Sequence, residues 1–322
     1  MWRGFLLIMN HDLSCLAKGR ALIRSGIVTL VGKPNTGKSS LINAIFQQKV
    51  VIVSDKPQTT WHHIRCVYTD GTSQIIFSDT PGVNKPIGPL GKYMTKAVRS
   101  ALEGSDLVLW LFDCSRGVTE AERYVYDKIQ SIEPPVFAVL NKIDLAGPTE
   151  IDKVLADMAE FGPFAETHQT SATTGVGLAR LMEGIKIRLP EGDFLYDPEV
   201  LIDKPIRFIV SELIREKIYR YTSKKIPYET GVYIEHLDEK PSSGLSIRAE
   251  IFVSRDNHKG ILIGKGGEMI RKIRLSAKRD IEILFDRKVG LELYVRVKER
   301  WMHDENLRTK DLDFETIVRK SR

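Results

Sequence analysis

The chain has 322 residues, of which 42% are hydrophobic and 28% charged, a composition typical of globular proteins with one very large domain or two ordinary ones. No apolar run approaches the roughly 18–20 residues of a membrane-spanning helix. The three cysteines are scattered, which argues against a disulfide framework or a cysteine metal site, so a reducing cytosol is expected. Residues 201–322 contain 27 Lys and Arg against 20 Asp and Glu, whereas the first 200 residues contain 21 against 22. A polyanionic partner is therefore expected for the C-terminal part alone.

Residues 1–25 are mildly basic and allow three interpretations. The apolar run at residues 5–9 is too short for the hydrophobic region of a signal peptide. An organellar transit peptide is one interpretation. The sequence favours a frayed extension, or a start codon assigned too early with Met9 as the true start.

The first predicted strand, residues 26–31, leads into Gly-Lys-Pro-Asn-Thr-Gly-Lys-Ser, and residues 41–46 follow as a helix. This order is typical of a phosphate-binding P-loop, because glycines let backbone N–H groups point at phosphate and the helix N-terminus adds partial positive charge. Lys38 is expected to reach the β- and γ-phosphates, and the Ser39 hydroxyl to bind Mg²⁺. The predicted nucleotide-binding residues of this loop are Gly32, Lys33, Pro34, Asn35, Thr36, Gly37, Lys38, Ser39 and Ser40.

Two apolar runs, residues 64–68 and 74–78, flank a Thr-Asp-Gly-Thr turn and predict a β-hairpin. The second run ends in Asp-Thr-Pro-Gly. Downstream of a P-loop, this motif places a carboxylate beside Mg²⁺ and a glycine amide near the γ-phosphate. The predicted site residues here are Asp79, Thr80, Pro81, Gly82 and Val83.

Apolar strands and helices then alternate along the chain. Helices are predicted at residues 90–102 and 119–132, and strands at residues 107–112, 136–140 and 165–170. A further helix ends near Arg188. This pattern predicts a doubly wound α/β sheet that binds its ligand at the carboxyl ends of the strands.

Asn-Lys-Ile-Asp follows the strand at 136–140 and predicts specificity for guanine. Guanine presents two donors on one edge, and the Asp144 carboxylate can accept both, whereas adenine would leave it unpaired. Lys142 is expected to lie against the base and Asn141 to brace the loop, while the Ala172 amide can reach guanine O6. The predicted base-binding residues are Asn141, Lys142, Ile143, Asp144, Ser171 and Ala172.

A Pro- and Gly-containing segment at residues 189–194 marks a domain boundary. After it, Asp203 is expected to cap a helix with Pro205 just inside. Residues 232–237 and 245–253 alternate like two paired strands, residues 268–278 predict a helix, and residues 291–297 predict a last strand.

Residues 259–267, Lys-Gly-Ile-Leu-Ile-Gly-Lys-Gly-Gly, join a short helix to a second helix through a tight glycine loop. This is the GXXG element of a KH domain, whose small loop lets a nucleic-acid backbone approach beside an apolar groove. The order helix-strand-strand-helix-helix-strand is that of a type II KH domain. Eight basic and two acidic residues lie between Arg255 and Arg279. The predicted RNA-binding residues are Lys259, Gly260, Ile261, Ile263, Gly264, Lys265, Gly266, Gly267, Arg271 and Lys272.

The nucleotide motifs resemble those of translation-factor-related GTPases. Within them, they resemble the class with a hydrophobic residue, here Val83, where many GTPases hold a water-orienting glutamine. Members of that class often use an asparagine, here Asn35, to help hold K⁺, so K⁺ stimulation is a hypothesis. The resemblance also implies that a threonine closes onto Mg²⁺, and Thr60 is favoured over Thr59. It assigns catalytic roles to Asn35, Lys38, Thr60 and Gly82, and Mg²⁺ binding to Ser39, Thr60 and Asp79.

A GTPase of this class followed by a type II KH domain resembles the Era family over roughly residues 25–302. The most specific likeness lies in residues 57–60, 79–82, 90–94 and 259–267. The resemblance implies binding to the 3′ end of small-subunit (16S) rRNA and to a nearby hairpin during small ribosomal subunit assembly. It also implies weak peripheral association with the inner membrane face.

Four residues depart from the family pattern. Trp61 stands in place of a basic residue, Asn84 in place of a histidine, and Arg274 and Asp286 in place of glycines. These departures affect the expected loop contacts and the fit of RNA.

The predicted organisation is an N-terminal extension at 1–25, a GTP-binding domain at 26–190, a linker at 191–204, a KH domain at 205–302 and a C-terminal tail at 303–322. The predicted function is a monomeric, cytoplasmic, slowly hydrolysing GTPase switch that uses GTP or GDP with Mg²⁺. A constitutive RNA-binding protein that no longer hydrolyses GTP and an organellar version of the same factor remain alternatives. A metabolic P-loop kinase would leave the guanine motif and the GXXG segment unexplained.

Overall fold

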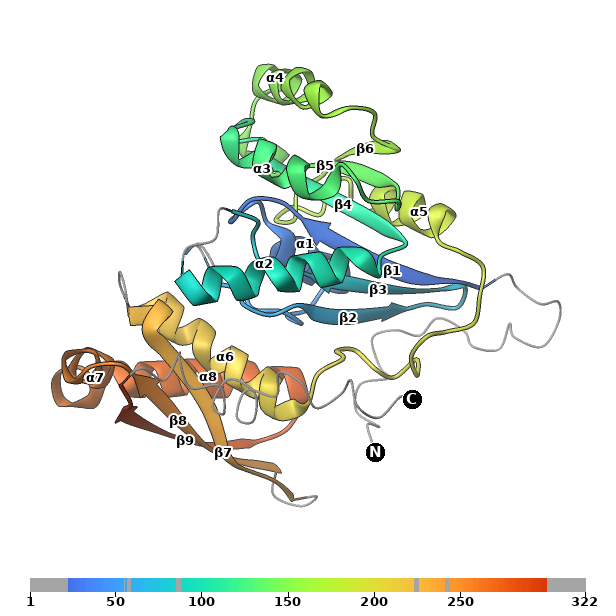
Figure 1. The fold of residues 1–322 in the computed structure, drawn as a ribbon. Helices are drawn as coiled ribbons and strands as arrows, with labels where there is room; N and C mark the ends of the chain where they lie inside the picture. Colours follow the sequence, from blue (N-terminus) through green and yellow to red (C-terminus); the bar gives the residue numbers. More distant parts are fainter. Residues whose placement is uncertain are drawn as a thin grey trace. The chain divides into compact units, whose positions relative to one another are not determined.

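The computed structural model describes residues 23–54, 56, 59–84, 88–222, 226–240 and 244–299. The chain divides into two compact units, Met1–Asp203 and Lys204–Arg322, called here the N-terminal and C-terminal units (Figure 1). The predicted C-terminal tail and nearly all of the predicted N-terminal extension lie outside the described residues.

A six-stranded sheet forms the centre of the N-terminal unit, with strand order β2-β3-β1-β4-β5-β6. β2 pairs antiparallel with β3, and the other neighbours are parallel. The strands are β1 (Arg24–Val31), β2 (Ile64–Thr69), β3 (Ser73–Asp79), β4 (Leu107–Asp113), β5 (Val136–Asn141) and β6 (Glu166–Gln169). The hairpin and the doubly wound parallel sheet predicted from the sequence are both confirmed.

Helices lie on both faces of this sheet (Figure 1): α1 (Lys38–Phe46), α2 (Gly88–Glu103), α3 (Glu120–Ile129), α4 (Pro148–Met158) and α5 (Leu178–Arg188). The predicted helix at 119–132 is shorter in the structure and runs from Glu120 to Ile129. Thr119 is its N-cap and forms a capping box with Glu122, and Gln130 is its C-cap. α4 was not predicted from the sequence.

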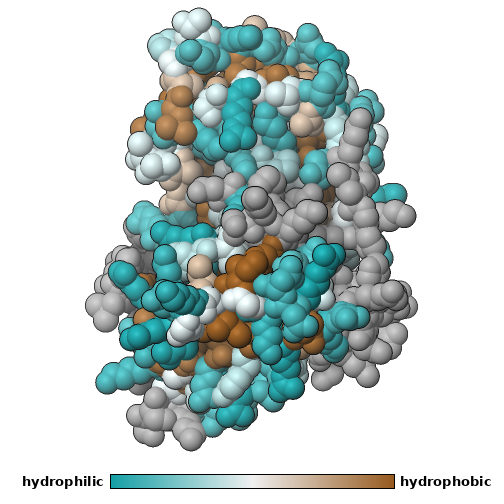
Figure 2. Space-filling model, turned by 90° about the vertical axis from the view of Figure 1, so that its left-hand side faces the viewer, coloured by the Kyte–Doolittle hydropathy of each residue, from teal (hydrophilic) through white to brown (hydrophobic). Residues whose placement is uncertain are grey.

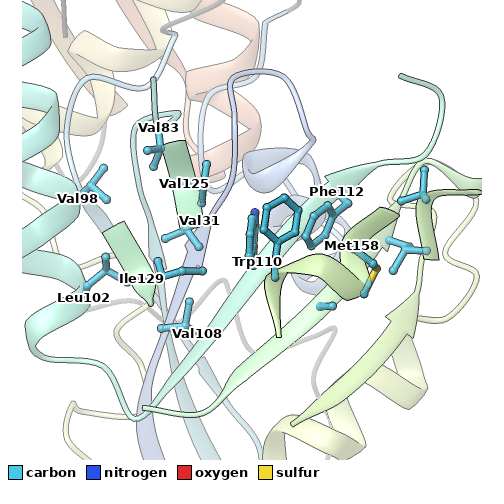
Figure 3. Close-up of a cluster of buried hydrophobic side chains, with 14 of the residues drawn as sticks. Val31, Val83, Val98, Leu102, Val108, Trp110, Phe112, Val125, Ile129 and Met158 are labelled. Carbon is cyan, nitrogen blue, oxygen red and sulfur yellow. The ribbon is translucent and has the colours of Figure 1, made fainter. Parts of the chain in front are cut away.

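A hydrophobic cluster packs one face of the sheet against α2, α3 and α4. Trp110 and Phe112 of β4 lie at its centre, with ring centroids 4.6 Å apart (Figure 3). Val83, four residues past the end of β3, belongs to the same cluster and is 6% exposed. The core therefore holds the segment that follows the Asp-Thr-Pro-Gly motif.

Residues 194–203, called here the strap, run along β2 instead of leaving the N-terminal unit. Val67 N–H donates to Leu201 O at 2.9 Å, and Asp203 N–H donates to Arg65 O at 2.9 Å. The Gln74 amide oxygen accepts from the backbone N–H groups of residues 195 and 196 at 2.7 and 2.8 Å. Backbone and side-chain hydrogen bonds thus dock the strap on the sheet.

The C-terminal unit has the predicted order helix-strand-strand-helix-helix-strand. Its elements are α6 (Ile206–Tyr221), β7 (Thr230–Lys240), β8 (Gly244–Val253), α7 (Asp256–Ile263), α8 (Glu268–Phe285) and β9 (Val289–Val297). β8 is the central strand, antiparallel to β7 and parallel to β9. This is the arrangement of a type II KH domain.

Two expectations for this unit need correction. Pro205, not Asp203, is the N-cap of α6. The Asp203 carboxylate instead accepts a hydrogen bond from the Tyr196 hydroxyl at 2.7 Å, which ties it to the strap. α8 continues about two turns beyond the predicted end at 278, because Ile281, Leu284 and Phe285 keep its apolar face buried.

Candidate nucleotide site and RNA interface

The glycine-rich loop joins β1 to α1 in a tightly packed conformation. Gly37 has φ +95° and caps α1, and a Cβ there would lie 2.3 Å from Asn141 Nδ2. Asn35 also has a positive φ of 66°, and Thr36 is fully buried with its hydroxyl donating to Lys33 O at 3.1 Å. This conformation requires glycine at position 37, as a phosphate-cradling loop does.

Lys38, the first residue of α1, folds over the loop. Its Nζ donates to Gly32 O and Lys33 O, at 3.2 Å each. Burial lowers the pKa of Lys38 to about 8, against an opposing effect of Asp79. Among the described residues, the buried Lys38 ammonium donates only to neutral carbonyl oxygens, which do not neutralise its positive charge. The oxygens of a bound phosphate can supply the missing negative charge.

Three oxygen-bearing side chains from separate segments meet beside α1. Ser39 Oγ donates to Asp79 Oδ2 at 2.7 Å and lies 3.4 Å from Thr60 Oγ1. The Thr59 hydroxyl, in contrast, donates to Lys56 O at 2.7 Å. The structure thus brings Ser39, Thr60 and Asp79 together and directs Thr59 elsewhere.

Asp79 is fully buried, and its Oδ1 has no hydrogen-bond partner among the described residues. Burial raises the pKa of Asp79 to about 6, outweighing the hydrogen bond from Ser39 and the charge of Lys38. An unpaired buried carboxylate oxygen beside two hydroxyls fits the all-oxygen coordination of Mg²⁺. This arrangement has one carboxylate and two hydroxyls, unlike a metal site built only from His, Cys, Asp and Glu. Within the described ranges, no group of three or more side chains of those four types lies together to hold a metal.

The segment after Asp79 presents its backbone to the P-loop. Val83 N–H donates to Gly32 O at 3.0 Å, and a Cβ on Gly82 would lie 2.7 Å from Pro34 Cα. The Thr80 hydroxyl donates to Leu30 O at 2.6 Å, and the Val83 side chain lies in the core cluster (Figure 3). Neither side chain is therefore placed to hold an attacking water.

The predicted base-binding loop follows β5 and is bonded to the P-loop. Asn141 Nδ2 donates to Thr36 O at 2.9 Å, while its Oδ1 accepts from Ala172 N–H at 3.3 Å and from the Thr170 hydroxyl at 3.2 Å. Lys142 Nζ donates to Asn35 O at 2.6 Å. Asn141 therefore has the geometry of the bracing residue expected from the sequence.

Asp144 is exposed and makes no hydrogen bond or ion pair with any described residue, so its carboxylate is available to a ligand. Ile143 is partly buried against the core cluster, and its N–H donates to Thr170 O at 3.3 Å. The buried Ser171 accepts from Thr174 N–H at 3.1 Å through its hydroxyl. The Ala172 amide, predicted to reach a base, is bonded to Asn141 in this structure.

The side chain of Lys33 points away from the loop interior. Its Nζ lies 2.9 Å from Glu122 Oε1 and donates to Gly117 O at 3.1 Å. The other Glu122 oxygen accepts from the N–H and hydroxyl of Thr119, at 2.8 and 2.6 Å. Only the backbone of Lys33 is therefore available to a nucleotide. No sequence pattern predicts the ion pair with Glu122, which lies 89 residues further along the chain.

The GXXG loop of the C-terminal unit lies between α7 and α8. Gly264, Gly266 and Gly267 have φ of +73°, +58° and +81°, and Lys265 is exposed. No atom lies within 4 Å of a Cβ built on Gly266 or Gly267. The loop therefore offers an open backbone surface at the N-terminus of α8.

The other predicted RNA-binding residues surround this loop. Ile261 is 48% exposed, Lys259 and Ile263 are partly buried, and Gly260 and Arg271 are exposed. Lys272 is exposed with its Nζ 4.4 Å from the centroid of the Tyr221 ring. Figure 2 shows hydrophobic surface between hydrophilic side chains on the face that carries α7. An apolar strip bordered by basic groups fits a single-stranded nucleic acid.

The fold and these sites define a P-loop nucleotide-binding protein with a KH domain. A family model described as "50S ribosome-binding GTPase" matches residues 27–142, and a KH domain model matches residues 218–302. The chain is 47% identical to GTPase Era of Thermotoga maritima over 281 residues, covering 87% of this chain and 93% of that protein. It is 41% identical to GTPase Era of Thermosipho melanesiensis, covering 92% of this chain and all of that protein.

Solved structures agree with these relatives. A crystal structure of Era with MgGDPNP and nucleotides 1506–1542 of 16S ribosomal RNA is similar, with a TM-score of 0.84 and 34% identity. The match covers 89% of this chain and 98% of the Era chain. A point variant of Aquifex aeolicus Era bound to GDP·AlF4⁻ has the same coverage and TM-score at 33% identity. The chain belongs to the Era family of GTPases.

Proposed function

We propose that the protein hydrolyses GTP and binds the single-stranded 3′ end of small-subunit rRNA through its KH domain. The main support is that Ser39, Thr60 and Asp79 lie together beside the P-loop. One buried Asp79 oxygen has no hydrogen-bond partner among the described residues. These three side chains would hold a divalent cation, which would supply positive charge beside the phosphates of a bound nucleotide.

Each part of the N-terminal unit has a separate role in the proposed reaction. The P-loop amides and Lys38 bind the β- and γ-phosphates, and the Gly82 N–H approaches the γ-phosphate. Asp144 accepts the two donors of guanine, and Lys142 lies against the base. Ser39, Thr60 and Asp79 would hold Mg²⁺, and a bound Mg²⁺ would supply the positive charge that phosphoryl transfer needs. Valine has no side-chain amide and Val83 packs in the core, so no side chain at that position orients the attacking water and intrinsic turnover is slow.

Asp79→Asn tests this site. We expect this variant to retain GDP binding without Mg²⁺ but to lose the gain in affinity that Mg²⁺ brings, together with GTP turnover. The wild-type protein measured with and without Mg²⁺ is the reference. Equal GTP turnover in the two proteins would contradict the proposed metal site.

The RNA part of the proposal has support from the exposed GXXG loop and from the Era structure that contains nucleotides 1506–1542 of 16S ribosomal RNA. Binding of a labelled RNA with the sequence of the 16S 3′ tail is measured at fixed salt, first with GDP and then with a non-hydrolysable GTP analogue. Tighter binding with the analogue supports a nucleotide-gated switch. Equal binding indicates two independent modules, and no binding contradicts the RNA target.

Three finer parts of the proposal concern potassium, the ribosome and the membrane. For K⁺, we expect faster GTP turnover in K⁺ than in Na⁺, and equal rates would remove the role proposed for Asn35. Action in small-subunit assembly and weak peripheral membrane association stay predictions. Among the described residues, no helix is long and apolar enough to cross a membrane.

A further inference from the structure

Asp113, the last residue of β4, has a buried carboxylate at the edge of the nucleotide site. Its side chain is 1% exposed. Oδ1 accepts from the hydroxyl and N–H of Ser115, at 2.6 and 3.1 Å. Oδ2 accepts from Lys142 Nζ at 2.7 Å. Arg116, whose Nε lies 3.9 Å away and whose side chain is 64% exposed, adds a weaker interaction.

The Lys142 ammonium is held from two directions. It donates to Asn35 O of the P-loop and to Asp113, so the ammonium lies between the P-loop and the end of β4. The Lys142 backbone has φ +63°, which a lysine adopts at a cost. Lys142 Cε lies 3.8 Å from a Cβ built on Gly37, which places the side chain over the loop.

Sheet register brings these groups together. Asp113 of β4 pairs with Asn141 of β5, so the carboxylate stands beside the residue that precedes Lys142. Cys114 N–H donates to Asn141 O at 3.0 Å and continues the connection past the strand ends. The carboxyl ends of parallel strands thus supply both the base-contacting lysine and the group that holds it.

From this geometry we propose that Asp113 is a positioning residue for guanine-nucleotide binding that acts through Lys142. The proposal rests on the proposed binding of GTP and GDP. A lysine whose ammonium is already fixed beside the P-loop loses little conformational entropy when a purine stacks on its chain. Without the Asp113 charge, Lys142 keeps only a carbonyl partner, and the surface that receives the base is less ordered.

The test is the dissociation rate of fluorescent GDP from Asp113→Asn, which keeps the shape of the side chain and removes its charge. We expect the rate to rise at least tenfold. The rate for IDP, which lacks the 2-amino group of guanine, should rise by the same factor, because Lys142 contacts the ring face and not that amine. Asp113→Glu, which retains a carboxylate, should recover most of the affinity.

Asp106→Asn is a matched control, because the Asp106 carboxylate accepts from Ile27 N–H at 2.7 Å near the start of β4. Its GDP dissociation rate should equal that of the wild type. If Asp113→Asn does not fold, Ser115→Ala removes a donor to Asp113 and should raise the rate severalfold. Thermal unfolding of each nucleotide-free variant separates a loss of stability from a loss of binding.

Two outcomes would overturn the inference. Unchanged dissociation rates in both Asp113→Asn and Ser115→Ala would mean that Lys142 needs no such support. Unequal changes in the GDP and IDP dissociation rates would mean that Asp113 acts through the edge contacts of Asp144 instead. Absence of GDP binding by the wild-type protein would instead contradict the proposed function, so the two failures are distinguishable.

Discussion

The two glycine loops of the protein are built in opposite ways. In the P-loop, a Cβ on Gly37 would lie 2.3 Å from Asn141, whereas in the GXXG loop Gly266 and Gly267 have open space around them. Lys38 is buried and bonded to loop carbonyls, whereas Lys265 is exposed. The first loop is shaped before its ligand arrives. The second offers a surface on which a flexible polyanion can settle, so the two should respond differently to mutation and salt.

Gly37→Ala should have the largest effect. The added methyl group collides with Asn141 and requires φ +95°, a strained conformation that costs about 1–3 kcal/mol in a non-glycine residue. We expect GDP binding to become undetectable by calorimetry. Gly71→Ala is the control, because nothing lies within 4 Å of its Cβ and its φ is not positive. Normal GDP affinity in Gly37→Ala would contradict the description of this loop as tightly shaped.

Lys265→Glu tests the open loop. Reversing one exposed charge beside a phosphate backbone should weaken RNA binding about tenfold and reduce the salt dependence, with GDP affinity unchanged. Lys288→Glu makes the same charge change beyond the other end of α8 and should weaken binding far less. Titrations at three salt concentrations measure both quantities. Equal losses in the two variants would indicate only a general electrostatic effect.

The turn between β2 and β3 in the N-terminal unit contains Asp70, whose carboxylate makes the stability of this unit depend on pH. Burial raises the pKa of Asp70, but the hydrogen bond and charge of Lys186 and the hydrogen bonds of the turn outweigh it, leaving the pKa below the usual 3.8. Ionised Asp70 therefore stabilises the folded state above pH 3.8, and this contribution is lost as the pH falls further.

Asp70→Asn should lower the stability of the N-terminal unit by about 1 kcal/mol at pH 7, and the difference from wild type should disappear in acid below the pKa of Asp70. Hydrogen exchange in β1–β3 measures this, with exchange in β7–β9 as the internal reference. A difference that persists undiminished below pH 3 would mean that the Lys186 ion pair does not carry the effect.

Asp286→Gly should have the smallest effect, and it should be stabilising. Asp286 ends α8 with φ +47°, the left-handed conformation that glycine adopts without strain. The substitution should add about 0.5–1 kcal/mol, offset in part by the greater freedom of glycine in the unfolded chain. Denaturant unfolding of the variant and of Asp286→Ala gives the comparison. The order of stability should be Gly, then Asp, then Ala.

Local motifs predicted the parts of the site that adjacent residues build. The P-loop, the hairpin, the Asn-Lys-Ile-Asp loop and the GXXG loop each depend on short segments with a characteristic backbone. The choice of Thr60 over Thr59 is also consistent with the observed distance to Ser39.

Long-range partners could not be predicted. Three features of the site depend on residues that the sheet brings together from distant parts of the sequence. They are the ion pair of Lys33 with Glu122, the hydrogen bond from Lys142 to Asp113 and the burial of Val83 in the core. Nothing in the sequence near Lys33 distinguishes a phosphate-facing lysine from one bonded to a distant helix. The cap expected at Asp203 was wrong for the same reason, since its carboxylate is bonded to Tyr196 of the strap.

The strap also has a consequence for solubility. β2 is an edge strand of the sheet, and a bare edge strand offers unpaired N–H and C=O groups to other chains. Leu201 and Asp203 occupy such groups on Arg65 and Val67, so the strap closes this edge. A fragment ending at Pro190 would keep every nucleotide motif but leave the edge open. We therefore expect it to self-associate, whereas a fragment ending at Asp203 should stay monomeric.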